Sequence, residues 1–252
     1  MYTDNVLMVG IIAGLIQFIG YLVYYQKSIK GSVEPNPLTW LMFAYGTMIL
    51  FVLEFDQGAS VSELILPAVC SACGVGIAVR IWIIAFRKDG TLWPSTWRIE
   101  RNWEGRSFAC DLILTAAYLA AWGLTLTSWL SEGERLIASL VFLFLANATT
   151  FTAFLPVLKQ AWQAPRTEHW LPWAVWTMSY GLLVWVTAVE SEVMLPTNWN
   201  VLDWKYDFWT WVALMIYPVS NALLHGLVAV FACPRRQQLA EETEEAVMLR
   251  AE

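Results

Sequence analysis

Charged residues are scarce in this chain. They make up 14% of its 252 residues, and 58% of the residues are hydrophobic, whereas a soluble domain has about 25% charged residues. Long polar segments are missing too, because apolar stretches fill most of the sequence and leave no loop of domain size. Length alone would allow one or two soluble domains. The composition instead predicts one membrane domain, since this much apolar surface cannot be buried in water.

Residues typical of active sites are also few. The chain has two histidines and lacks a metal-ligand cluster or a nucleophile motif, so we expect neither an enzyme nor a metal or cofactor. The last apolar segment has no lysine that could form a retinal Schiff base. We interpret the Cys70 and Cys73 pair as small packing residues rather than a redox or zinc motif. The net charge of −6 owes much to a Glu-rich tail, and we expect no nucleic-acid partner.

Seven stretches supply the roughly 20 apolar residues that a membrane-spanning helix needs. Their continuous apolar character, without alternation at every second residue, excludes a barrel. We expect an all-α membrane protein with spans at Val6–Tyr25, Pro37–Phe55, Leu64–Phe86, Phe108–Leu130, Leu136–Leu158, Leu171–Val189 and Phe208–Phe231.

The distribution of Lys and Arg predicts the orientation, because cytoplasmic loops are enriched in these residues. Apart from Arg80 inside a span, one side has twelve basic residues and the other only Arg135 and Lys205. We therefore expect the amino terminus outside, the carboxyl terminus in the cytoplasm, and a plasma or inner membrane location. The acidic tail at 237–252 is predicted to be disordered. Both a monomer and a homo-oligomer are compatible with the sequence.

An internal repeat relates the two ends of the chain. Pro37 matches Pro172 and Tyr45-Gly46 matches Tyr180-Gly181 at an offset of 135, and the later pair Arg80 and His225 follows at 145. Spans one to three thus correspond to spans five to seven. The fourth span is then a linker that makes the two copies parallel. We expect a first repeat with its cytoplasmic loop at 1–106, the linker helix at 107–135 and the second repeat at 136–236.

The second copy contains FLPVLKQAWQAPRTEHWLPWAVWTMSYGLLVW. This segment resembles the Phe-Leu-Pro-Gln helix end, the short basic loop with Ser/Thr-Glu and the following helix of the SWEET and PQ-loop superfamily. Members of that superfamily consist of two triple-helix bundles in a three-one-three order. The resemblance implies a carrier with alternating access, in which Asn221 corresponds to the Asn that hydrogen-bonds a sugar. Pro37, Pro156 and Pro172 are the counterparts of three prolines typical of SWEET transporters.

A carrier of this kind binds its solute near the bilayer midplane, between aromatic faces and a few polar groups. The amide of Asn221 suits a polyol, although an Asn within a span also packs helices together. Gly76, at the position matching Asn221, would leave room for a larger ligand. The remaining candidates lie deep in predicted spans and are Trp40, Tyr45, Asn147, Trp176 and Tyr180. Lipid contact or packing is the alternative for each tryptophan.

Gating or coupling candidates are ionisable groups and prolines within the spans. Arg80 and His225 match in the repeat and could bind an anion or gate the pathway, while a long Arg side chain can also reach the headgroups. Pro37, Pro156 and Pro172 would act as hinges. Asp111 begins the fourth span near Arg106, where a carboxylate is favourable for ordinary electrostatic reasons.

Two functions fit this pattern. The first is a facilitative or proton-linked carrier of a small polar solute such as a sugar. The alternative is a receptor that binds a ligand or cargo without net flux, with the basic loop from Arg87 to Arg106 as its cytoplasmic contact surface.

Overall fold

The computed structural model describes residues 2–33, 35–89, 103–194 and 201–234. Within these ranges the chain is helical and contains no strand. A short 3₁₀ turn, η2 (Pro165–Thr167), lies between two of the long helices. The seven long helices are α1 (Tyr2–Ile29), α2 (Pro37–Asp56), α3 (Val61–Asp89), α4 (Trp103–Leu126), α5 (Glu132–Gln163), α6 (Trp170–Met194) and α7 (Val201–Phe231).

Each of these seven helices is long and apolar enough to cross a membrane. Many of their large apolar side chains point outward, as expected of helices in contact with lipid, and Leu15 and Ile113 are typical examples. The prediction of seven spanning helices and of a multi-pass membrane protein is therefore confirmed for the described residues. The acidic tail and most of the predicted basic loop lie outside them.

Some helices end at other residues than predicted, because local polar groups determine where the helix stops. The fourth span was predicted to reach Leu130, but α4 ends at Leu126 because Ser128 adopts a left-handed φ of 61°. Trp129 then donates its backbone N–H to the Leu124 carbonyl at 2.9 Å, which closes the helix end. The next helix begins with a capping box, in which Ser131 and Glu134 bind each other's backbone N–H.

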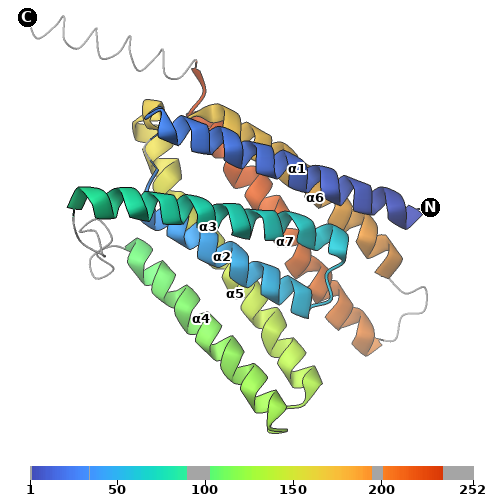
Figure 1. Ribbon diagram of the computed structural model, residues 1–252. Helices are drawn as coiled ribbons and strands as arrows, with labels where there is room; N and C mark the ends of the chain where they lie inside the picture. Colours follow the sequence, from blue (N-terminus) through green and yellow to red (C-terminus); the bar gives the residue numbers. More distant parts are fainter. Residues whose placement is uncertain (1, 34, 90–102, 195–200, 235–252) are drawn as a thin grey trace, which may run out of the picture.

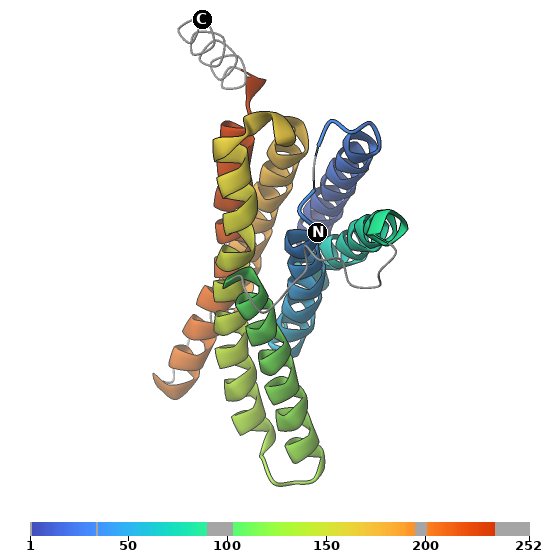
Figure 2. The same ribbon diagram turned by 90° about the vertical axis from the view of Figure 1, so that its left-hand side faces the viewer.

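Six of the long helices lie in two groups on opposite sides of the molecule, and they pack both within and between these groups. Figure 2 shows α1, α2 and α3 on one side and α5, α6 and α7 on the other. Within the first group α3 packs against both α1 and α2, and within the second α7 packs against both α5 and α6. Between the groups α1 packs on α6 and α2 on α5. The helix α4 runs alongside α5 and also touches α2 (Figures 1 and 2).

Two glycines bring α1 close to α3. Gly10 and Gly14 form a G-x-x-x-G pattern, which lets two helix backbones approach each other in a membrane. A Cβ at Gly10 would lie 2.5 Å from the Ser62 carbonyl oxygen, and one at Gly14 would lie 2.6 Å from a methyl carbon of Ile65. Larger side chains at either position would therefore separate these helices.

One buried ion pair joins α2 to α5. Arg135, at the start of α5, forms a salt bridge with Asp56 at the end of α2, and both side chains are buried. The Arg135 guanidinium also lies 4.1 Å from the ring centroid of Trp122 on α4. This arginine thus holds three helices together at one end of the bundle.

Candidate functional site

A pocket lies between the two groups of helices and is called here the aromatic pocket. Six of the seven helices line it, and α3 does not. Its cavity volume is about 30 Å³, room for two or three water molecules, within about 480 Å³ of irregular empty space that includes the open mouth. The lining residues are Tyr21, Trp40, Met42, Phe43, Gly46, Thr47, Asp111, Thr149, Thr150, Ala153, Phe154, Trp173, Trp176, Tyr180, Asn221 and His225.

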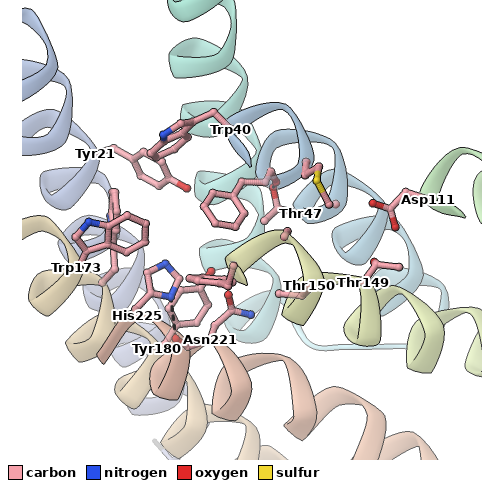
Figure 3. Close-up of a pocket in the computed structure, with 16 residues that line it drawn as sticks. Tyr21, Trp40, Thr47, Asp111, Thr149, Thr150, Trp173, Tyr180, Asn221 and His225 are labelled. Atoms are coloured by element: carbon pink, nitrogen blue, oxygen red, sulfur yellow. Dashed lines mark hydrogen bonds between the residues drawn. The ribbon is translucent and has the colours of Figure 1, made fainter. Parts of the chain in front are cut away.

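Aromatic rings form one wall of this pocket (Figure 3). Trp176 is its centre: its ring centroid lies 5.0 Å from that of Trp173 and 4.9 Å from that of Tyr21, and Trp40 follows at 6.1 Å. The Trp176 indole N–H donates to the backbone carbonyl of Gln17 on α1 at 3.2 Å. Trp176 is only 1% exposed, and these contacts fix its ring in place.

Two polar side chains enter the pocket from α7. The Asn221 amide donates to the Tyr217 carbonyl at 2.9 Å, one turn earlier in the same helix. The His225 Nδ1 lies 2.7 Å from the Asn221 carbonyl oxygen. Because a carbonyl only accepts, Nδ1 carries the proton and Nε2 keeps a lone pair in the neutral ring. No partner for Nε2 is recorded within the described residues.

A carboxylate enters from the opposite side. Asp111 of α4 is buried and faces Thr149 and Thr150 of α5 (Figure 3). It lies eight residues after the start of α4, beyond the first turn. A favourable interaction with the helix dipole therefore does not explain why a carboxylate lies here. Among the described residues, no Lys or Arg lines the pocket. The site therefore carries acceptors, hydroxyls and aromatic faces without a basic group to bind an anion.

The connection between α5 and α6 places a second carboxylate behind the aromatic wall. Glu168 is 2% exposed and accepts a hydrogen bond from the Trp173 indole at 3.0 Å. The Tyr24 hydroxyl donates to its other oxygen at 3.5 Å and accepts from the Trp40 indole at 3.2 Å. Burial raises the pKa of Glu168 to about 8, although the Trp173 and Tyr24 hydrogen bonds oppose this. Glu168 thus positions two of the pocket tryptophans.

A chain of buried hydrogen bonds runs from the aromatic pocket into the bundle. The Tyr180 hydroxyl lies 3.1 Å from the Tyr217 hydroxyl and 3.3 Å from the Cys70 sulfur. The Gln17 amide donates to the same sulfur at 3.1 Å, and Ser179 donates to the Gln17 carbonyl oxygen. Cys70 was predicted to be a small packing residue, but it also joins α1, α3 and α6 through these polar contacts.

Four of the seven predicted binding residues line the aromatic pocket, namely Trp40, Trp176, Tyr180 and Asn221. Three do not. Tyr45 donates its hydroxyl to Thr115 of α4 at 2.7 Å, and Asn147 donates to the Ala213 carbonyl of α7 at 3.4 Å. Gly76 lies on an exposed face of α3 with open space around it. The structure thus places Gly76 away from the aromatic pocket, because α3 does not line it.

Only some of the predicted gating residues lie at the aromatic pocket. His225 lines the pocket, whereas Arg80 places its guanidinium 4.6 Å from the ring centroid of Tyr25 on α1 and does not meet His225. Pro37 and Pro172 occupy the first turns of α2 and α6, where a proline starts a helix without bending it. Of the three predicted hinges, only Pro156 lies inside a helix.

Sequence reasoning assigned Asp111 to helix electrostatics and did not select Tyr21, Glu168 or Trp173 as site residues. Glu168 lies in a short connection, two residues before α6 begins at Trp170. Nothing in that position indicated that its carboxyl group is buried against α1. A carboxylate within an apolar segment is itself a functional signal, and for Asp111 that signal was available.

Comparisons with protein-family models, curated proteins and solved structures found no match for this chain.

Proposed function

We propose that this protein is a membrane carrier for a small polar solute without negative charge, such as a sugar, and that it binds this solute in the aromatic pocket. The observation that carries the proposal is the pocket's composition: a Trp and Tyr wall faces an amide, a carboxylate and three threonine hydroxyls inside a membrane-spanning bundle. Solute sites generally combine aromatic faces with a few convergent polar groups.

Alternating access follows from the position of the pocket between two units. We propose that α1–α3 and α5–α7 are parallel copies joined by α4, in the three-one-three order of the SWEET and PQ-loop superfamily. The packing supports this, because α1 on α6 and α2 on α5 are equivalent contacts under the repeat. Rocking one unit against the other would widen the narrow pocket enough to admit a solute.

The proposed orientation places the pocket in the cytoplasmic half of the bundle. Trp40 and Trp173 are close to the starts of α2 and α6, and His225 is close to the end of α7. These helix ends belong to the Lys- and Arg-rich side of the chain, which the positive-inside rule assigns to the cytoplasm. The solute would then leave or enter on that side after the contacting rings of Trp40 and Trp176 separate.

Uptake into proteoliposomes tests the proposal, after a thermal-shift screen of sugars, nucleosides and amino acids has selected a solute. We expect Trp176→Ala and Asn221→Ala to abolish uptake. Trp185→Ala is the matched control, because Trp185 lies on the same helix and is 45% exposed. Normal flux in both pocket variants would refute this site.

Binding without flux would identify the receptor alternative instead. A ligand that stabilises the protein, depends on Trp176 and Asn221, and is not taken up by proteoliposomes would give that result. Stabilisation by anionic compounds alone would contradict the proposed solute class, because the described residues of the pocket include Asp111 and no Lys or Arg.

A further inference from the structure

A second, smaller cavity lies deeper along α7 and is called here the acidic cavity. It has a volume of about 10 Å³, room for one water molecule or one small ion. Four helices contribute to it: α2, α3, α6 and α7. Its lining residues are Glu54, Glu63, Leu183, Thr187, Leu214, Tyr217 and Pro218.

Glu54 occupies an unfavourable position for a lone carboxylate. Its side chain is buried, at 3% exposure, and no hydrogen-bond donor or cation is recorded against it in the described part of the chain. It lies in the last turn of α2, where the helix dipole repels a negative charge. Glu63 is close enough to add further repulsion. A positive ligand would relieve all three costs.

The other polar groups around the cavity are also oxygens. Thr187 and Tyr217 contribute hydroxyls, and Thr187 lies within hydrogen-bonding reach of Glu63. Pro218 has no N–H, so it cannot donate to the carbonyl of Leu214 one turn earlier. Carbonyls released in this way, at broken points of membrane helices, are cation ligands in transporters.

Glu63 has a structural role, and that role uses only one of its two carboxylate oxygens. One oxygen accepts the Ser60 backbone N–H at 2.7 Å, while the Ser60 hydroxyl accepts from the Glu63 N–H at 3.3 Å. This capping box explains why α3 begins directly after Ser60. It does not explain Glu54, which has no such partner.

We propose that the acidic cavity binds one monovalent cation, Na⁺ or a proton, between Glu54 and the surrounding oxygens. A divalent metal is disfavoured, because the described residues contain no group of three or more acidic, His or Cys side chains placed to hold one. The titratable groups that face Glu54 are Glu63 from α3 and Tyr217 from α7, and Glu190 of α6 acts on Glu63.

The cation site is connected to the aromatic pocket by two hydroxyls. Tyr217 lines the acidic cavity and Tyr180 lines the aromatic pocket, and their oxygens are 3.1 Å apart. The Tyr180 ring lies 4.9 Å from that of His225. A change of charge at Glu54 therefore reaches the solute site through one hydrogen bond, and coupling of cation to solute, which rests on the proposed function, would use this path.

The test uses the full-length protein in detergent without any solute. Its melting temperature is measured in NaCl, KCl and choline chloride at equal ionic strength, and infrared difference spectra between about pH 5 and about pH 9 detect protonated carboxyl groups. Glu54→Gln removes the proposed ligand charge. Glu63→Gln removes a charge while keeping the capping box, and Glu132→Gln is the control because Glu132 is exposed.

A Na⁺ site predicts that NaCl at about ten times the Kd raises the melting temperature by about 3–6 °C over the other salts. This rise would be lost in Glu54→Gln and kept in Glu132→Gln. A proton site predicts no salt preference but a protonated-carboxyl band that is absent from Glu54→Gln. Glu168 has a pKa of about 8 and gives a carboxyl band of its own in this range, so the spectra with and without Glu54→Gln are both recorded in a Glu168→Gln background. The salt comparison on the wild type remains decisive for Na⁺ if Glu54→Gln does not fold.

The proposal is overturned if the wild type shows no preference for Na⁺ and no carboxyl band is lost on replacing Glu54 by Gln in the Glu168→Gln background. It is also overturned if either signal is unchanged in Glu54→Gln. None of these measurements involves the solute, so failure of the carrier hypothesis would leave the result on the cation site intact. Tyr217→Phe then tests the coupling: it should keep the cation signal and remove the dependence of solute affinity on the cation.

Discussion

Replacing Glu168 by Gln should make this protein more stable at alkaline pH and leave it unchanged at acid pH. The carboxyl of Glu168 is buried between Tyr24 and Trp173, and burial raises its pKa to about 8. Gln has the same shape as a protonated Glu. It can still accept the Trp173 hydrogen bond, and it carries no charge at any pH.

The direction follows from the two protonation equilibria. In the unfolded chain Glu168 loses its proton near its ordinary pKa of 4.5, whereas in the folded protein it keeps the proton up to about pH 8. Below 4.5 both states are protonated and burial has no charge cost. As the pH rises between these values, the unfolded state is favoured by about 1.4 kcal/mol for each pH unit. The folded protein should lose on the order of 5 kcal/mol in all.

Thermal unfolding in detergent measures this loss. Because 1 kcal/mol corresponds to about 2–4 °C for a chain of this size, we expect the wild-type melting temperature to fall by roughly 10 °C between about pH 5 and about pH 9. Burial and nearby Lys27 lower the pKa of His169. At acid pH this makes the stability of the fold rise with pH, opposite to the effect of Glu168. The difference between wild type and Glu168→Gln removes this contribution. Two curves that stay parallel across the range would refute the reasoning.

Three further substitutions test other parts of the structure. Arg135→Met should lower the free energy of unfolding by about 3–5 kcal/mol, measured by thermal or denaturant unfolding, because it leaves a buried carboxylate unpaired. A Cβ added by Gly20→Ala would overlap the Trp176 indole, so solute-induced stabilisation should be lost, whereas Gly123→Ala has open space and should retain it. Pro218→Ala should stabilise α7 by up to about 3 kcal/mol but slow uptake; unchanged flux would contradict a role in bending.

The helices were predictable because hydrophobicity within a membrane is a strong signal. The span from Pro37 was predicted to end at Phe55, and α2 ends at Asp56. Errors arose at ends that polar contacts decide, such as the left-handed Ser128 that stops α4. The sequence was a weaker guide to which helices pack against each other. The pattern of Gly10 and Gly14 indicates a close helix contact, but nothing in the sequence shows that α3 is the partner.

The aromatic pocket was predicted in part, because depth in a span can be estimated from sequence but direction cannot. Trp176 and Trp185 are both deep in α6, yet one is buried in the pocket and the other is 45% exposed. Nine residues separate them, which places them on different sides of the helix. Gly76 and Asn221, which the predicted repeat pairs, do not line the same cavity, because α7 lines the aromatic pocket and α3 does not.

The helix α7 connects the two cavities through residues four positions apart. Tyr217 lines the acidic cavity, and Asn221 and His225 line the aromatic pocket, so one face of a single helix serves both. Asn221 and His225 each bond the backbone carbonyl one turn earlier, and side chains that do so tend to bend a helix. Pro218 weakens the same turn further. Bending at this point would shift the Tyr217 hydroxyl and the pocket groups together, so the region between Leu214 and His225 is where cation binding and solute access would be coupled.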